Sequence, residues 1–388
     1  MTILTTTDEL AAFCRSLAGT EYVTVDTEFM RDRTYWPKLC LVQLGGPNGA
    51  VAVDPLAAGI DLAPLFAVMD DPSILKVFHA ARQDVEIFYH LTGRIPAPLF
   101  DTQVAAMVCG FGEQVSYEAL ASRLADARLD KASRFTDWAQ RPLTERQVIY
   151  ALSDVTHLRV VYEYMRRHLD QTGRESWLVE ELAVLTQPAT YQNNPRESWQ
   201  RLKVRGGDGK FRAVLQELAA WREEEAQRVD IPRGRVLRDE SLLEIAHHAP
   251  DSVEALSRTR GVSAGFAEGK HGTALLDAVR RALARPSADW PPALEGSARH
   301  GVSERAAATV ELLRVLLRMV SEEEGVASRL VASAHDLDMI AMDGEKAQTP
   351  VLHGWRHQIF GEQALALRRG DLALAIEGGR VKTLATRP

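Results

Sequence analysis

Two acidic side chains, Asp26 and Glu28, lie one residue apart in the otherwise apolar stretch EYVTVDTEF, which has the pattern of a β-strand. Side chains at positions i and i+2 of a strand point to the same face, so the two carboxylates converge on one patch. Like charges repel, and their burial costs solvation free energy. A cation is therefore expected beside them, either a basic side chain or a metal ion.

Three further residues favour a metal ion. Asp84 lies about one turn inside a predicted helix that follows a strand, near the sheet edge where the active sites of α/β folds gather. Tyr150 and Asp154 are spaced i, i+4 in a long predicted helix, so they share one face. Four carboxylates without His or Cys at ligand spacing suit Mg²⁺ or Mn²⁺. Two such ions can hydrolyse a phosphodiester, and Tyr150 could orient the attacking water.

Residues next to the acids are candidates for holding a polynucleotide. Phe29 and Met30 directly follow Glu28 and could stack on a terminal base, although packing in the core is an equal alternative. The basic residues nearby could hold phosphates or could be solvated charges at a strand edge. They are Arg31, Arg33 and Lys38.

Two polar residues are expected behind the acids. Asp101, in LFDTQ, stands where a strand-like stretch turns into a helical one, which is the pattern of a helix N-cap. His79, in VFHAARQD, is expected to be a hydrogen-bonded core histidine. Each could also support a metal ligand from a second layer.

Composition limits the classes of protein. The chain has 388 residues, 46% hydrophobic and 26% charged, enough for two or three globular domains. A net charge of -7 argues against binding a polyanion over the whole surface, so any such partner is held locally and its binding should weaken sharply in salt. Three cysteines give no disulfide framework. With no signal peptide and no apolar run of about 18 residues, we expect a cytoplasmic protein that does not associate with membranes.

A change of periodicity near residue 175 divides the chain. Before it, short strands and helices alternate in an α/β pattern, predicted to be a mixed sheet that begins with an antiparallel meander and is flanked by helices. After it, the sequence is almost entirely helical as far as residue 376. The predicted parts are an α/β domain at 1–172, a helical and basic linker at 173–207, and all-α domains at 208–290 and 298–378.

Local signals mark helix starts and one basic segment. Thr144 with Gln147, and Asp251 with Glu254, have the spacing of a capping box. Residues 195–212 contain six Lys or Arg against two acids. This segment is either a solvated linker or a contact with a phosphate backbone.

The order Asp26-x-Glu28, Asp84 and Tyr150-x3-Asp154 resembles the tyrosine-containing branch of the DEDD exonuclease superfamily, and DTEFMRDRTYWPKLCLVQL with FHAARQD resembles the bacterial ribonuclease D family. This resemblance implies a ribonuclease H-like fold and metal-dependent 3′-to-5′ exonucleolysis that releases nucleoside 5′-monophosphates. It implies metal ligation by the four acids and positioning of water by Tyr150. The implied substrates are structured RNA precursors with single-stranded 3′ ends, notably tRNA.

Residues 211–281 resemble the helicase-and-RNase-D C-terminal (HRDC) domain, in LAAWREEEAQRVDIPRGRVLRDESLLEIAHHAPDSVEAL. The last domain keeps a similar helical character with little recognisable motif, so it is expected to be a divergent second HRDC-like domain. No obligate protein partner is inferred.

Two other functions remain open from the sequence. A DNA 3′-to-5′ exonuclease of the proofreading or helicase-associated kind would use the same acids, because 2′-hydroxyl contacts are not visible in the sequence. A catalytically silent nucleic-acid-binding protein is the other alternative. All five catalytic positions are filled, which counts against it.

Overall fold

The computed structural model describes most of the chain, in residues 2–129, 136–204, 206–292 and 304–386. The chain divides into two compact units. The first unit contains residues 1–28, 40–187 and 301–388, and the second contains residues 29–39 and 188–300.

Two predicted features fall partly outside the described residues. These are Arg205 in the basic segment and residues 298–303 at the start of the last predicted domain. Within the described ranges, no helix is both long enough and apolar enough to cross a lipid bilayer.

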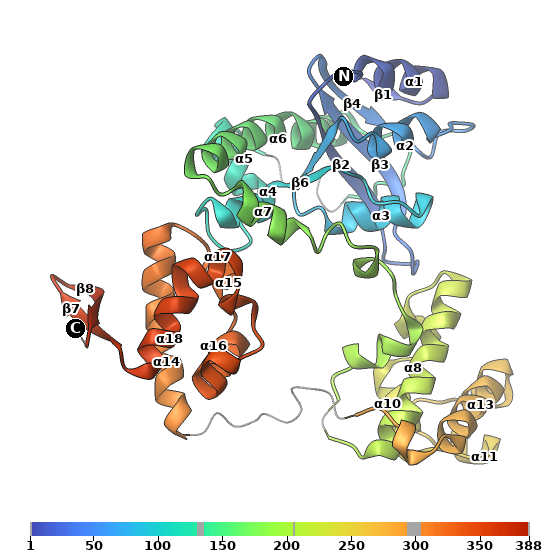
Figure 1. Cartoon of the computed structure of the whole chain (residues 1–388). Helices are drawn as coiled ribbons and strands as arrows, with labels where there is room; N and C mark the ends of the chain where they lie inside the picture. Colours follow the sequence, from blue (N-terminus) through green and yellow to red (C-terminus); the bar gives the residue numbers. More distant parts are fainter. Residues whose placement is uncertain (1, 130–135, 205, 293–303, 387–388) are drawn as a thin grey trace. The chain divides into compact units, whose positions relative to one another are not determined.

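A sheet lies in the first unit (Figure 1). It has six strands, in the spatial order β1-β4-β3-β2-β5-β6. Strand β4 runs antiparallel to β3 and parallel to β1, whereas β5 is parallel to both β2 and β6. The predicted mixed sheet is therefore confirmed, and β1 is a short addition that the sequence analysis did not predict. The strands are β1 (Ile3–Leu4), β2 (Tyr22–Met30), β3 (Lys38–Gly46), β4 (Gly49–Val53), β5 (Leu75–Phe78) and β6 (Leu99–Asp101).

Helices α1 to α7 lie in the same part of the first unit as this sheet. The longest is α6, and the predicted capping box starts it: the Thr144 hydroxyl accepts from the Gln147 N–H, and the Gln147 side chain accepts from the Thr144 N–H. It ends at Gly173, whose φ of 66° is the left-handed conformation that glycine adopts readily. The helices are α1 (Thr7–Ser16), α2 (Ala63–Asp70), α3 (Arg82–Thr92), α4 (Thr102–Val108), α5 (Tyr117–Ala125), α6 (Glu145–Thr172) and α7 (Glu175–Leu182).

Helix α6 packs closely on the sheet near Gly45. The Thr24 hydroxyl of β2 donates to the Val155 carbonyl oxygen of α6 at 2.8 Å. A Cβ atom on Gly45 would lie 2.3 Å from Thr24 Oγ1 and 3.1 Å from the Val155 oxygen, so only glycine fits there. This contact fixes the middle of α6 beside β2.

The first unit also contains the C-terminal helices, which enclose a core of their own. Trp355 stacks on Trp177 of α7 with ring centroids 4.5 Å apart, and Arg356 forms ion pairs with Glu180 and Glu181 of the same helix. The elements are α14 (Glu304–Glu324), α15 (Ser328–Val331), α16 (Ala334–Asp343), η5 (Gly344–Lys346), η6 (Pro350–Leu352), α17 (Gly354–Arg356), the π-helical η7 (His357–Gly361) and α18 (Glu362–Arg369).

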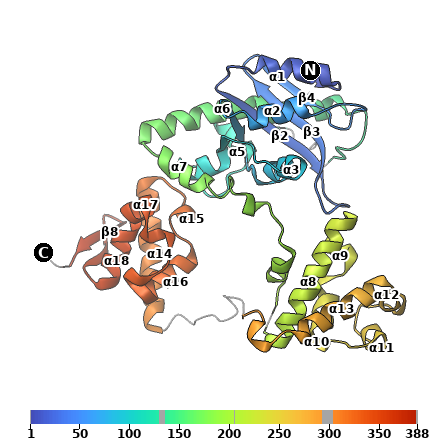
Figure 2. The same cartoon turned by 45° about the vertical axis from the view of Figure 1, so that its right-hand side comes forward.

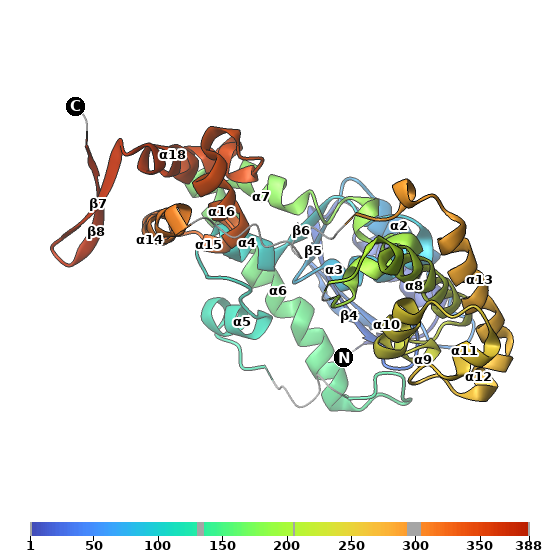
Figure 3. The same ribbon diagram turned by 90° about the horizontal axis from the view of Figure 1, so that it is seen from below.

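The helical prediction is wrong at the end of this region. Strands β7 (Leu372–Glu377) and β8 (Arg380–Ala385) form an antiparallel hairpin, which extends from the end of α18 (Figure 3). Gly378 and Gly379 both have positive φ, 59° and 78°, as a two-residue hairpin turn requires. The alternation of larger apolar residues with other residues in LALAIEGGRVKTLA is a strand signal, which the analysis of helical periodicity overlooked.

The second unit is built around α8, with α10 and α13 packed beside it (Figure 2). The predicted helical character is confirmed, but the N-cap of α11 is Ser252 and not Asp251, because the Ser252 hydroxyl accepts from the Ala255 N–H. The elements are η2 (Pro188–Thr190), η3 (Pro195–Arg201), α8 (Gly209–Val229), α9 (Arg233–Val236), α10 (Asp239–His248), α11 (Val253–Ser257), α12 (Ala264–Glu268), α13 (Lys270–Ala284) and η4 (Ser287–Asp289).

The connection between β2 and β3 also belongs to the second unit. Tyr35 is buried there against Ala226 and Val236. The backbone N–H groups of Tyr35 and Trp36 donate to the Asp230 carboxylate at 3.0 and 2.9 Å. The sequence indicates only that this segment follows the two acids of β2. In the structure it is packed into the second unit.

Candidate active site

The acids of β2 meet an acid of α6. One oxygen from each of Asp26, Glu28 and Asp154 lies within 4.8 Å of the other two. Asp26 and Glu28 are half-buried and Asp154 is buried. The i, i+2 spacing in the strand and the position of α6 across β2 together produce this three-carboxylate cluster.

Asp84 lies in the first turn of α3, is buried, and interacts electrostatically with Asp26. The Thr27 hydroxyl donates to Asp84 Oδ1 at 2.5 Å. Burial raises the pKa of Asp84 well above its ordinary value, repulsion from Asp26 raises it further, and the Thr27 hydrogen bond offsets part of the rise. Asp84 thus lies outside the three-carboxylate cluster but near enough to Asp26 for their charges to interact.

Repulsion from a neighbouring acid, Asp154, also acts on Asp26. Burial raises the pKa of Asp26 well above its ordinary value, and the charge of Asp154 adds to that effect. Among the described residues, neither Asp26 nor Asp84 has a lysine or arginine within ion-pair distance. These two carboxylates can be neutralised by a bound cation or by protons. The all-oxygen donor set of the cluster fits hard divalent cations.

Two residues that the sequence analysis missed hold Asp154 in place. The Tyr117 hydroxyl donates to the Asp154 carbonyl oxygen at 2.6 Å and interacts with the Ser153 carbonyl oxygen at 3.0 Å. Thr24 binds the next carbonyl of the helix, as described above. Both contacts join residues far apart in the sequence, and nothing in the local pattern around Tyr117 or Thr24 indicates them.

Tyr150 lies one turn before Asp154 in α6 and is half-buried. The centroid of its ring lies 6.1 Å from the centroid of the Trp138 ring. The predicted pair thus shares one helix end, with the phenol held beside an aromatic neighbour.

Asp101 and His79 connect the end of β6 with the residues just before α3. Asp101 caps α4, as predicted, by accepting from the Gln103 N–H at 2.7 Å, and it also accepts from the Ala80 and Ala81 N–H groups at 3.0 and 2.9 Å. His79 Nδ1 lies 3.0 Å from the Thr102 hydroxyl oxygen, and burial lowers the pKa of His79 to about 4. Both side chains therefore fix the backbone that leads into Asp84.

The candidate RNA contacts remain predictions. Phe29 and Met30 end β2 and are half-buried, as is Arg31. Arg33 is exposed and lies 3.5 Å from Asp32, and Lys38 is exposed. All five belong to the second unit, whereas the four acids belong to the first.

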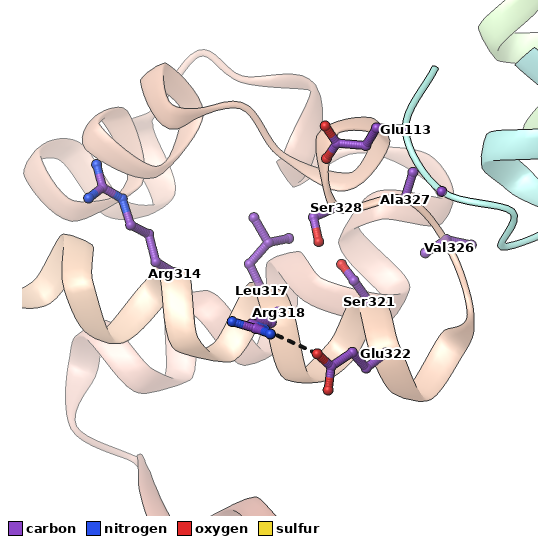
Figure 4. A pocket seen from close by; sticks show the side chains of 10 residues that line it. Glu113, Arg314, Leu317, Arg318, Ser321, Glu322, Val326, Ala327 and Ser328 are labelled. Atoms are coloured by element: carbon purple, nitrogen blue, oxygen red, sulfur yellow. Dashed lines mark hydrogen bonds and ion pairs between the residues drawn. The ribbon is translucent and has the colours of Figure 1, made fainter. Parts of the chain in front are cut away.

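A pocket of about 440 Å³ lies elsewhere in the first unit, between α14 and the loop at Glu113 (Figure 4). It contains none of the predicted site residues. The Ser321 hydroxyl on its wall is buried without a hydrogen-bond partner in the described part of the chain, and Arg318 at its edge is paired with Glu322 at 3.0 Å. The pocket and the acid cluster are separate features.

Comparisons with known proteins agree with the architecture. The family described as 3′-5′ exonuclease matches residues 1–170, and the family described as HRDC domain matches residues 211–279. The ribonuclease D of Gluconacetobacter diazotrophicus is 52% identical over 382 residues, which cover 98% of this chain and 96% of that protein. The ribonuclease D of Nitrobacter hamburgensis is 51% identical over 381 residues, 98% of each chain.

Solved structures share the fold over most of the chain. Escherichia coli RNase D, an exoribonuclease involved in structured RNA processing, is 29% identical with a TM-score of 0.77, covering 94% of this chain and 98% of that one. A protein from Bifidobacterium adolescentis, at 22% identity, has a TM-score of 0.69 and covers 95% of this chain and 96% of its own. The second likeness supports the fold alone.

Proposed function

This chain belongs to the ribonuclease D family and is a 3′-to-5′ exoribonuclease, and from that premise we propose how its acids perform the hydrolysis. Exonucleases of this family are metal-dependent. We propose that Asp26, Glu28, Asp84 and Asp154 hold two divalent ions, Mg²⁺ or Mn²⁺. The observation that carries this proposal is the approach of three carboxylates to within 4.8 Å beside the buried Asp84.

When bound, such ions stabilise the charge that develops on phosphodiester oxygens and make water more acidic. The residues of the chain hold the ligand oxygens together before the substrate arrives, because β2, α3 and α6 are fixed by the contacts of Thr24, Thr27 and Tyr117. Tyr150 orients the attacking water through its hydroxyl. In this role the hydroxyl acts as a hydrogen-bonding partner of the water and not as the base.

The products follow from the bond that breaks. Water oxygen forms a bond to the last phosphorus, the bond from phosphorus to the 3′ oxygen of the preceding nucleotide breaks, and that 3′ oxygen takes a proton. The phosphate stays with the released nucleoside on its 5′ oxygen. Each cycle thus releases a nucleoside 5′-monophosphate and leaves a new 3′-hydroxyl.

The proposed substrates are structured RNAs with single-stranded 3′ ends, in particular tRNA precursors. The RNase D of E. coli is described as acting in structured RNA processing, which supports this class. Phe29 and Met30 would stack on the terminal base, and Arg31, Arg33 and Lys38 would hold phosphates. The basic residues of segment 195–212 would extend the contact along the RNA.

The remaining parts of the chain are assigned by the same proposal. The exonuclease domain comprises 1–172, the linker 173–207, the HRDC domain 208–290, and a second, divergent HRDC-like domain 298–378. Cys14, Cys40 and Cys109 form no disulfide bond with one another, which supports action in the cytoplasm. No obligate protein partner is required by this mechanism.

The test is a time course with RNA labelled at the 3′ end or the 5′ end, each paired with its DNA counterpart, with Mg²⁺, Mn²⁺ or a chelator. We expect metal-dependent release of mononucleotides from the 3′ end of RNA by the wild-type protein and none by Asp26→Asn. The matched control is Asp170→Asn, an exposed acid in α6, which should keep full activity.

Other outcomes point to the alternatives. Faster release from DNA than from RNA would favour a DNA exonuclease, although the relatives named above do not favour it. Equal release by Asp26→Asn would mean that the carboxylates are structural. No release under any metal would leave a nucleic-acid-binding protein.

A further inference from the structure

Trp138 lies against Tyr150, outside the acid cluster. Its side chain is 2% exposed, and the two ring centroids are 6.1 Å apart with the planes inclined at 34°. This distance is typical of packed aromatic pairs. A ring fixed beside a tyrosine restricts its χ1 and χ2 angles, and hence the positions that the phenol oxygen can reach.

Trp138 is itself held by Arg141. The guanidinium donates to both carboxylate oxygens of Asp54, at 2.6 and 2.7 Å, and to the Cys40 carbonyl oxygen at 2.7 Å. It also donates to the carbonyl oxygens of Trp138 and Gln140, at 2.8 and 2.9 Å. These five contacts use all five N–H groups of the side chain. Arg141 therefore ties the Trp138 loop (residues 136–141) to β3 and to the end of β4.

A second contact ties the other end of the Trp138 loop to α6. The Gln147 side-chain amide donates to the Thr136 hydroxyl at 3.1 Å, while its oxygen accepts from the Thr144 N–H at 3.0 Å. The residue that closes the capping box of α6 thus also anchors the loop. Tyr150 lies less than one turn further along the same helix, so the loop and the phenol are fixed to one frame.

We propose that Trp138 is a positioning residue for Tyr150 in the hydrolysis, and that Arg141 holds the Trp138 loop in register for this purpose. The inference rests on the proposed role of Tyr150 as the residue that orients water. Trp138 does not belong to the acid cluster. Its effect is therefore on the turnover rate and not on the affinity for RNA or metal.

The first test compares kcat and KM on RNA for Trp138→Leu, Trp138→Phe and Trp355→Leu. Trp355 is a matched control, because it is 5% exposed and its indole N–H, like that of Trp138, is buried without a hydrogen-bond partner among the described residues. We expect Trp138→Leu to lower kcat by about ten- to a hundredfold with KM within about twofold, and Trp138→Phe to restore most of the rate. A Trp138→Leu enzyme with the kcat of Trp355→Leu overturns the proposal.

Arg141→Lys tests the same idea with a smaller change. Lysine keeps the positive charge but cannot reproduce five planar contacts, so the loop loosens while the core stays filled. We expect a lower kcat with unchanged KM. An unchanged kcat overturns the proposal even if Trp138→Leu does not fold.

The Tyr150→Phe background separates this inference from its premise. If Tyr150→Phe alone leaves kcat unchanged, the proposed role of Tyr150 fails and the positioning role fails with it. If Tyr150→Phe lowers kcat and the double variant with Trp138→Leu is no slower, Trp138 acts through the phenol hydroxyl, as proposed. A further loss in the double variant equal to that of Trp138→Leu alone means that Trp138 acts by another route, and the proposal falls while the role of Tyr150 stands.

Discussion

Glu223 and Asp84 are both buried carboxylates, exposed by 1% and 6%, but their surroundings differ. Glu223, in α8, accepts from Arg233 Nη2 at 2.8 Å and also from Arg233 Nε and the Tyr35 hydroxyl. Burial raises the pKa of Glu223, but these hydrogen bonds outweigh burial and hold the pKa below its ordinary value. The chain supplies the countercharge for this acid itself.

Asp84 receives one neutral hydroxyl, from Thr27, and a neighbouring negative charge, from Asp26. Its pKa rises where that of Glu223 falls. The comparison separates a buried acid whose charge is balanced within the fold from one whose negative charge is not balanced by a basic side chain. Four changes test this distinction, beginning with the largest expected effect.

Removing the charge of Asp84 should abolish activity and stabilise the metal-free protein. Asp84→Asn should lower the rate on RNA by about 10³-fold or more, since Asp84 is a metal ligand in the proposed mechanism. It should raise Tm in chelator, because the repulsion from Asp26 disappears and asparagine can still accept the Thr27 hydrogen bond. Differential scanning calorimetry with and without metal gives the measurement. A lower Tm in chelator would contradict the comparison.

The same change at Glu223 should have the opposite effect on stability. Glu223→Gln leaves Arg233 and Tyr35 without their buried anion, so it should cost about 2–3 kcal/mol, below the usual cost of breaking a buried pair because Arg233 is partly exposed. Chemical denaturation measures this loss. Glu224→Gln, an exposed neighbour in α8, is the control and should be neutral. Recovery of the loss by added metal would contradict a purely structural role.

Thr27 tests the side-chain hydrogen bond that moderates the pKa of Asp84. Thr27→Val keeps the shape but removes the donor, so the pKa of Asp84 should rise further and Mn²⁺ affinity should fall by about tenfold, as for other groups that support metal ligands. Thr27→Ser should restore the affinity. Titration calorimetry with Mn²⁺ measures both variants, and equal affinity for Val and wild type would show that the bond has no influence on the metal.

The stability of the protein should also change with pH, gradually and in one pH range for Asp26 and Asp84 and in another for Glu223. In folded, metal-free protein the raised pKa values of Asp26 and Asp84 mean that the folded state holds protons that the unfolded state has released. Stability should therefore fall as pH rises from about 4 through the raised values. The lowered pKa of Glu223 acts in the opposite sense, and its contribution is lost as pH falls through that value.

Unfolding in chelator across pH checks both signs. Asp26→Asn should flatten the loss of stability at the higher pH values, and Glu223→Gln should flatten the loss in acid. Added Mg²⁺ should stabilise the wild type more as pH rises, because metal and protons compete for the same oxygens. A metal effect independent of pH would argue against binding at these carboxylates.

The sequence predicted what depends on short spacing. Asp26 and Glu28 share a face because a strand alternates with period two, and Thr144 with Gln147 caps α6 because the two groups meet within one turn. These relations are set by local backbone geometry. They do not depend on how the rest of the chain packs.

Contacts between distant segments could not be read in the same way. Thr27 meets Asp84 across 57 positions, and Tyr117 meets the Asp154 carbonyl across 37. Such pairs depend on how the strands and helices pack, which periodicity does not specify. The packing of residues 29–39 was not predicted for the same reason. Their basic side chains suggested RNA contacts, but nothing in the local sequence indicated that Tyr35 is buried and joins this segment to α8.

Two local predictions were wrong although the sequence contained the correct signal. The β7–β8 hairpin has two adjacent glycines between alternating residues, and the true cap of α11 stands one position after the predicted Asp251. In both, a neighbouring pattern competed with the correct one.

The donor atoms of the acid cluster make the choice of metal ion depend on which ions the cell supplies. Oxygen ligands alone do not reject zinc or copper by affinity, since almost any protein site binds those ions more tightly than manganese. With one oxygen from each of Asp26, Glu28 and Asp154 and no thiolate or imidazole in the group, the site has no soft donor to favour scarce thiophilic metals. In the proposed mechanism, the ion that occupies this site is therefore set by which hard cation the cell keeps plentiful.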